Sequence, residues 1–125
     1  MAEHRYTRAD LYKAVSEDDG ELVRTILEEG PLNINELGNN EETVLHYAAR
    51  EGYTDVVQVL CTVVGVEVNL LDVEGCTALH YAASSGHTDI VRVLCTVVGV
   101  EVNIQDKLGY TALHYVARRL ERTHF

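Results

Sequence analysis

The chain has 125 residues, of which 46% are hydrophobic, and a formal net charge of −10. This length suits a single domain, and the excess of acidic side chains disfavours nucleic acid and anionic lipid as partners because both are negatively charged. The amino-terminal segment has no apolar run typical of a signal peptide, and no stretch approaches membrane-spanning length, so we expect a cytoplasmic protein, with the nucleus as the alternative.

A period of 34 residues runs through the chain. Residues 59–69 recur without substitution as residues 93–103, and residues 77–82 recur with changes at 43–48 and 111–116. A fixed period of this length is typical of stacked supersecondary units that bury their apolar faces against one another. The period divides a single domain, residues 1–125, into units at about 4–37, 38–71 and 72–105 and a partial fourth unit at 106–125. The identity of the two 11-residue copies points either to recent duplication or to deliberate construction.

Unit one diverges most from the repeated pattern. Residues 9–12 stand where the later units have Thr-x-Leu-His, and residues 1–42 hold 11 acidic and 4 basic side chains. The acidic pairs at 18–19 and 28–29 lie at expected helix ends, where solvation explains them. We therefore predict that unit one is a negatively charged end of the stack.

The loop and first helix of each unit are most clearly indicated in unit three. Asp72 and Gly75 predict a tight turn, and Thr77 is the expected N-cap of a short helix. Gly86 is expected to end that helix in the left-handed conformation. Unit two has Gly38-Asn39-Asn40-Glu41 in place of the Asp-x-x-Gly turn, so we expect its loop to be looser.

The second helix of unit three is expected to begin at a cap formed by Thr88 or Asp89 and to close at Gly99. Its apolar stripe, which should face the core, consists of Ile90, Val91, Leu94 and Cys95. Residues 100–103 are expected to run extended into the next turn. The pattern thus predicts a helix, a tight turn and a helix in each unit.

The three cysteines form no Cys-x-x-Cys pair and suit a reducing compartment. Cys61 and Cys95 occupy equivalent positions one repeat apart, which is too far for a disulfide, and we interpret both as core residues. Cys76 falls in a predicted turn and is expected to be exposed.

Unit four contains the first-helix pattern at residues 111–119, but no apolar second helix follows in residues 120–125. The second helix of unit three should therefore present an uncovered apolar face, although terminal repeats usually have a polar outer side. We expect weak self-association through this carboxyl-terminal end, or further units beyond this sequence.

The combined motifs resemble the ankyrin-repeat family. The matching segments are Thr-Ala-Leu-His-Tyr-Ala at 77–82, Gly-His-Thr-Asp-Ile-Val at 86–91, and Val-Glu-Val-Asn at 100–103 before the next Asp-x-x-Gly. Ala or Val replaces the family's usual Pro after Thr, and one additional residue lies in residues 96–99. The resemblance covers nearly the whole chain and implies an all-α ankyrin-repeat solenoid of helix-turn-helix units joined by projecting β-hairpin-like loops.

Three histidines at 34-residue spacing, His46, His80 and His114, could suggest a metal ladder or a catalytic row. Equivalent positions in successive units do not converge on one coordination sphere, as zinc requires. The resemblance implies instead that their ring nitrogens bond Thr and loop backbone. Cys76 and His80 could mimic a nucleophile and base, but nothing in the sequence orients the imidazole for that role. We therefore expect no enzymatic activity, no metal and no cofactor.

The resemblance further implies that a protein partner binds the concave face made by loop tips and first-helix exteriors. The candidate partner-binding residues are Arg50, Glu51, Leu71, Val73, Glu74, Cys76, Ser84, Ser85, Gln105, Lys107, Leu108, Tyr110, Arg118 and Arg119, with Asn39, Asn40 and Glu42 as weaker candidates. The tips differ in sequence between units. For any single tip residue, the absence of a packing constraint at an exposed position explains this difference as well as partner binding does. Apolar and aromatic groups clustered on an exposed strip nevertheless favour an interface, and the two arginines predict an acidic patch on the partner. A self-associating scaffold is the alternative.

Overall fold

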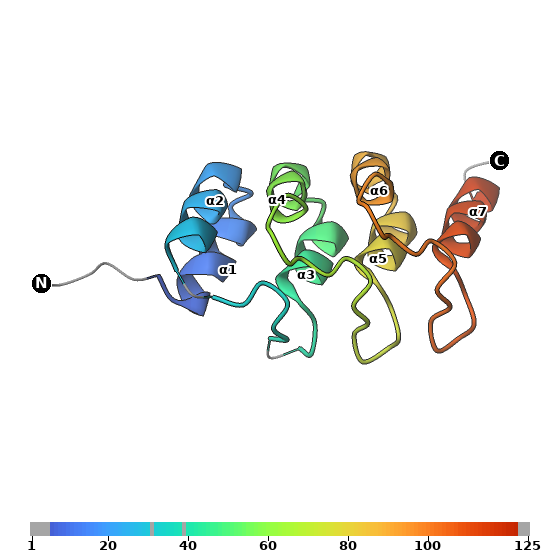
Figure 1. The fold of residues 1–125 in the computed structure, drawn as a ribbon. Coiled ribbons are helices and arrows are strands. Elements are labelled where there is room, and N and C mark those ends of the chain that lie inside the picture. The colour runs from blue at the N-terminus through green and yellow to red at the C-terminus, as the bar shows by residue number, and fades with distance from the viewer. Residues whose placement is uncertain (1–5, 31, 39, 123–125) are drawn as a thin grey trace, which may run out of the picture.

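The computed structural model describes residues 6–30, 32–38 and 40–122. Within these ranges the helices are α1 (Arg8–Ser16), α2 (Gly20–Glu29), α3 (Val44–Glu51), α4 (Thr54–Leu60), α5 (Ala78–Ser85), α6 (Thr88–Cys95) and α7 (Ala112–Arg122), and the described residues contain no strand. Figure 1 shows α1 with α2, α3 with α4 and α5 with α6 as successive pairs, followed by α7. The expected all-α solenoid is confirmed.

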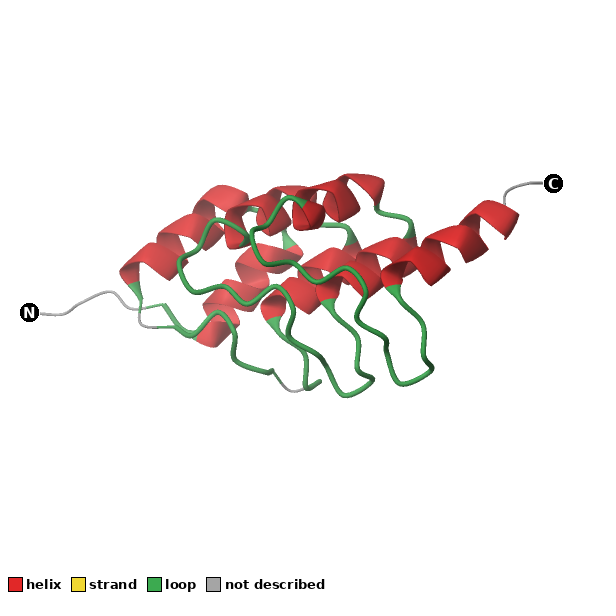
Figure 2. Cartoon of the chain, turned by 45° about the vertical axis from the view of Figure 1, so that its right-hand side comes forward, coloured by secondary structure: helices red, strands yellow, loops and turns green. Residues whose placement is uncertain are grey.

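The helices form two rows. The first helices α1, α3, α5 and α7 pack side by side, and the second helices α2, α4 and α6 form a parallel row against them (Figure 2). Long loops project from one end of the first helices. The largest fully buried apolar side chains between the rows are Leu11, Val15, Val23, Ile26, Val56, Val57, Leu60, Ile90 and Leu94. The buried stripe expected on the second helix is confirmed for Ile90 and Leu94.

The first helices begin at threonine caps. The hydroxyl of Thr77 accepts a hydrogen bond from the His80 amide, and the ring of His80 bonds back to the Thr77 backbone, which is the capping-box arrangement. The same arrangement begins α3, whereas α1 begins with Thr7 and Asp10. In the repeat, Ala9 is equivalent to the later threonine caps, but the cap of α1 is Thr7. Helix α1 therefore begins two residues earlier than the repeat indicates.

Glycine ends α5 as expected, because Gly86 has φ of 77° and its amide donates to carbonyls of the last turn. The expected start of α6 is wrong: its N-cap is His87, which makes no side-chain cap bond, and Thr88 is already helical. The reason is a tight connection, in which the Thr88 amide donates to the Gly86 carbonyl at 3.0 Å and leaves no room for an additional cap residue.

The expected end of α6 is also wrong. The helix ends at Cys95, where the Thr96 hydroxyl donates to the Val93 carbonyl at 2.6 Å, and Gly99 lies in a separate turn with φ of 88°. The Cys95 side chain is exposed instead of buried, because no second helix from unit four covers α6 among the described residues.

Asparagine side chains connect the loops that follow the second helices. The Asn69 amide donates to the Gly99 carbonyl at 2.8 Å, and its oxygen accepts from the Glu101 amide at 2.8 Å. Asn35 makes the equivalent pair of bonds one unit earlier, with the Gly65 carbonyl and the Glu67 amide. Residues 102–103 form a turn, so the expectation of an extended segment at 100–103 is wrong there. The repeated sequence therefore carries a hydrogen-bonded link between units.

Candidate protein-binding surface

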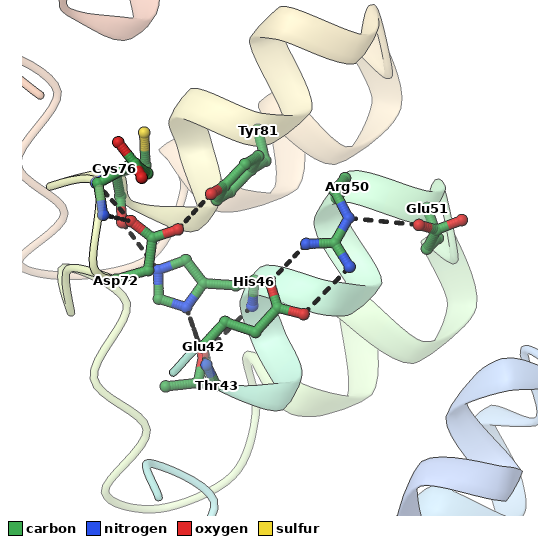
Figure 3. A network of polar contacts seen from close by, with 9 residues as sticks. Glu42, Thr43, His46, Arg50, Glu51, Asp72, Cys76 and Tyr81 are labelled. Carbon is green, nitrogen blue, oxygen red and sulfur yellow. Dashed lines mark hydrogen bonds and ion pairs between the residues drawn. The ribbon is translucent and has the colours of Figure 1, made fainter. Parts of the chain in front are cut away.

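Histidines bridge consecutive units beneath the loop tips. Nε2 of His46 donates to the Cys76 carbonyl at 2.9 Å, while Nδ1 accepts from the Thr43 amide at 3.1 Å (Figure 3). His80 makes the equivalent bond to the Tyr110 carbonyl, also at 2.9 Å. Both rings are engaged on both sides, so the structural role expected of these histidines is confirmed. His114 keeps only the local contact with its threonine among the bonds of the described residues.

The tip of unit three is held by an aspartate. One carboxylate oxygen of Asp72 accepts from the amides of Glu74 and Cys76, both at 2.9 Å, and the other accepts from the Tyr81 hydroxyl. Burial works to raise the pKa of Asp72, but these hydrogen bonds outweigh it and hold the pKa below its ordinary value. Asp106 holds the next tip in the same way, so both turns are fixed relative to the helices that follow them.

The tip of unit two has a backbone frame without that side-chain clamp. The Gly38 amide donates to the Glu42 carbonyl at 2.8 Å, and Glu41 has φ of 56° where the later tips have glycine. Since Gly38 has no carboxylate, the two amide bonds that Asp72 makes in unit three are missing here. The missing side-chain clamp is the physical reason to expect a looser loop in unit two. The candidate Asn39 lies outside the described residues.

Apolar side chains line the tips on the solvent side. Leu71 and Val73 are each 49% exposed and Leu108 is 75% exposed. Leu37, which precedes Leu71 by one period, is 50% exposed and was not among the sequence candidates, although its spacing could have identified it. These four residues, Leu37, Leu71, Val73 and Leu108, are called the tip strip below. The polar candidates Asn40, Glu74, Gln105 and Lys107 are also exposed.

Arg50 is already engaged within the protein. It forms a bidentate ion pair with Glu42, contacts Glu51 through Nε at 3.3 Å, and its guanidinium lies 5.7 Å from the ring centroids of both Tyr47 and Tyr81 (Figure 3). The hydrogen bonds that Arg50 donates to Glu42 raise the pKa of Arg50, despite partial burial. Glu42 is buried, so this ion pair within unit two is poorly placed to contact a partner, and the contact of Arg50 with unit three is made through the Tyr81 ring.

Cys76 is buried, and the expectation that it is exposed is wrong. The chain turns inward after the tip, so that the Cys76 sulfur lies 3.9 Å from an Asp106 carboxylate oxygen. Burial, together with neighbouring carboxylates, raises the pKa of this thiol to about 12. The ring of His80 is occupied by Thr77 and the Tyr110 carbonyl, which leaves no base to activate the sulfur.

Tyr110 is half-buried and does not project as an exposed tip residue. Its ring packs edge-on against Tyr115 at 5.6 Å between centroids, and the Arg118 guanidinium lies 5.8 Å from its centroid. Arg119 reaches back to unit three, where Nη1 donates to the Ser84 carbonyl at 3.0 Å. Side chains of Ser84 and Arg118 remain exposed, whereas Ser85 is half-buried.

The described residues contain no cluster of three or more His, Cys, Asp or Glu side chains arranged to hold a metal ion. In the same part of the chain, no helix combines the length and apolar character needed to cross a membrane.

A family model described as ankyrin repeats, in three copies, matches residues 11–106. No protein with a curated description matches the chain significantly. The matched range runs from within α1 to Asp106, and so contains helices α2 to α6 together with both bridging histidines, His46 and His80.

Proposed function

The chain belongs to the ankyrin-repeat family, whose repeats are generally protein–protein interaction modules. On this premise we propose that residues 1–125 form one non-enzymatic binding domain that recognises a protein partner through the tip strip and the exposed side of the first helices. The compartment we propose is the cytoplasm, because three free thiols suit a reducing environment.

The observation that carries this proposal is an apolar strip on a fixed frame. Leu71 and Val73 keep 49% of their surface exposed and Leu108 keeps 75%, while the turns that carry them are held by Asp72 and Asp106. Exposed apolar groups that are already ordered lose little conformational entropy on binding, which favours their use as anchors. An exposed cluster of this composition is typical of an interface core.

The charges beside the strip suggest the partner's character. Lys107 at the last tip and Arg118 on α7 are exposed and form no ion pair with any described residue, in a chain whose net charge is −10. We propose that they face an acidic patch on the partner. Such peripheral charges act mainly on association rate and salt dependence.

The test is affinity capture from cell lysate with three forms of the chain. The double variant Val73→Asp, Leu108→Asp places charge in the tip strip, and the control Val64→Asp makes the same change at a side chain that is 97% exposed outside it. A protein retained by the wild type and the control, but not by the double variant, supports the proposal. Retention by all three forms, with unchanged folding, would refute it.

Self-association through the carboxyl-terminal end is the second candidate, and exposed apolar surface on α7 favours it. Leu113 is 73% exposed and Leu120 is 63% exposed. Sedimentation equilibrium over a range of concentrations measures the assembly directly. A monomer at all concentrations would remove this candidate while leaving the tip-strip proposal untouched.

A further inference from the structure

The tip of unit two keeps the backbone of the later tips without their aspartate. Gly38 stands where unit three has Asp72, and its amide donates to the Glu42 carbonyl at 2.8 Å, as the Asp72 amide donates to the Cys76 carbonyl at 2.9 Å. In both units the amide three residues later donates back to the first carbonyl at 3.0 Å. The Asp72 carboxylate accepts from the amides two and four residues later, both at 2.9 Å. The equivalent amides of Asn40 and Glu42 are therefore placed to hold a carboxylate that Gly38 does not supply.

These two amides donate no hydrogen bond to another described residue. In unit three the same two donors are both satisfied by one carboxylate oxygen. Backbone amides that converge on one point form a binding site for an anion, because each adds a hydrogen bond to the same negative charge.

A tyrosine hydroxyl without a partner lies at the same point. Tyr12 occupies the repeat position of the bridging histidines, and a Cβ added to Gly38 would lie 2.8 Å from its hydroxyl oxygen and 3.6 Å from Nη2 of Arg8. The hydroxyl is buried and has no hydrogen-bond partner among the described residues. Burial raises the pKa of Tyr12 more than the nearby Arg8 lowers it, so the hydroxyl keeps its proton and can donate. An aspartate at residue 38 would collide with Tyr12, whereas a carboxylate from outside needs no Cβ there.

A cavity of about 440 Å³ opens beside these donors. Arg8 lies at this cavity with its guanidinium 5.5 Å from the centroid of the Tyr12 ring, and it pairs with Glu36 at 3.1 Å. The side chains of Arg8 and Glu36 are 30% and 53% exposed, and an ion pair at the surface contributes little, so Arg8 can exchange Glu36 for another carboxylate. This space is called the unit-two cavity, and its lining residues are Arg8, Tyr12, Gly38, Asn40 and Glu42.

The acidic side chains near the cavity do not exclude a further carboxylate. Glu42 forms a bidentate ion pair with Arg50, which compensates its charge. Glu41 is exposed, so that solvent and salt screen it, and Glu36 is released into solvent when Arg8 turns to a new partner. The groups that remain for a ligand are a guanidinium, a hydroxyl and two amides, which are all donors, so the site selects a carboxylate over an amine.

We propose that the unit-two cavity binds the side-chain carboxylate of an aspartate of the partner protein, in the role that Asp72 has within unit three. The carboxylate accepts from the amides of Asn40 and Glu42, from the Tyr12 hydroxyl and from Arg8. This deepens the proposed function and rests on it only for the source of the aspartate. It places an acidic contact of the partner beside Leu37, at the unit-two end of the tip strip.

The experiment follows the backbone amides of the isotope-labelled chain by nuclear magnetic resonance. Two blocked tripeptides serve as probes, acetyl-Gly-Asp-Gly-amide and its Asn counterpart, in which the carboxylate is replaced by a neutral amide of the same shape. We expect the Asp peptide to shift the amide signals of Asn40 and Glu42 saturably at millimolar concentrations. The Asn peptide should bind roughly tenfold more weakly, because its bonds to these donors lack the negative charge.

Variants locate the site. The double variant Tyr12→His, Gly38→Asp rebuilds the arrangement of unit three, so its own carboxylate should abolish the response to the Asp peptide. Arg8→Gln and Tyr12→Phe each remove one donor and should weaken the Asp peptide roughly threefold to tenfold. Lys13→Gln is the matched control, because Lys13 also lies on α1 and pairs with a glutamate, Glu17, but does not line the cavity.

Equal affinity for both peptides, or no saturable shift up to about 50 mM, would overturn the proposal. A response that Arg8→Gln and Tyr12→Phe leave unchanged would do the same, and a response that appears only in Glu3→Gln would assign the cavity to the chain's own acid. The tip-strip double variant should bind the Asp peptide like the wild type. Failure of lysate capture with an intact peptide response would therefore refute the proposed function while leaving the carboxylate site in place.

Discussion

Replacing the same histidine by alanine in two different units isolates the contribution of the bridge between units. His46 and His114 both return a ring nitrogen to a threonine N-cap. His46 is only 1% exposed and also donates to the Cys76 carbonyl, whereas His114 is exposed and makes no such bond among the described residues. The difference between the two variants therefore measures the bridge and the burial of the ring.

The magnitude follows from what each substitution removes. His46→Ala loses the cap contact, at about 0.5–1 kcal/mol, one inter-unit hydrogen bond, at about 1 kcal/mol, and a buried ring, at about 1–2 kcal/mol. The Cys76 carbonyl still accepts from the Asp72 amide, so no orphan acceptor adds to the cost. We expect a total loss of roughly 2–4 kcal/mol for His46→Ala and less than about 1 kcal/mol for His114→Ala.

Urea denaturation followed by far-ultraviolet circular dichroism checks both values, provided that the denaturant slope stays constant between variants. His80→Ala is the matched positive control, because His80 is 2% exposed and bonds the Tyr110 carbonyl. Equal losses for His46→Ala and His114→Ala, within about 0.5 kcal/mol, would show that the bridge contributes nothing and would refute the reasoning.

Three other predictions follow from the same structure. Leu94→Ala should destabilise the protein by roughly 2–5 kcal/mol because Leu94 is completely buried, and a loss below about 0.5 kcal/mol in chemical denaturation would contradict its core position. Because the pKa of Asp72 is lowered in the folded protein, its contribution to the free energy of unfolding is present above its ordinary pKa of 3.8 and is lost as the pH falls through the folded value. Asp72→Asn should therefore flatten the acid limb of a curve of stability against pH. An unchanged acid limb would argue against this role of Asp72. Cys95, which is exposed, should react with a thiol reagent far faster than the buried Cys76. Mass spectrometry of partially labelled protein measures the order of reaction, and faster labelling of Cys76 would contradict this prediction.

The sequence alone was sufficient for the features that depend on local chemistry repeated at a fixed spacing. Thr77 caps its helix and Gly86 ends it because one hydroxyl and one positive φ are needed there, and both requirements are visible in a short window. The buried position of Leu94 follows equally from the helical period of its neighbours.

Several of the errors concern residues whose surroundings come from another unit. Cys76 looks like a turn residue, but it is buried by the neighbouring tip that contains Asp106. Cys95 matches its buried stripe, but it is exposed because no described helix covers that side of α6. Arg119 shows no local sign of its bond to Ser84, since the contact spans two units and replaces one made by a histidine elsewhere.

The central claim, that the partner contacts the tip strip, is tested most directly by site-specific photo-crosslinking in cell lysate. A photoreactive phenylalanine analogue replaces Leu108, which is 75% exposed in the strip, and in a second form replaces Arg92, which is exposed on α6. The account predicts a discrete adduct with the protein retained in affinity capture from position 108 and none from position 92. An adduct with that protein from position 92 alone would place the interface on the second helices and contradict the account.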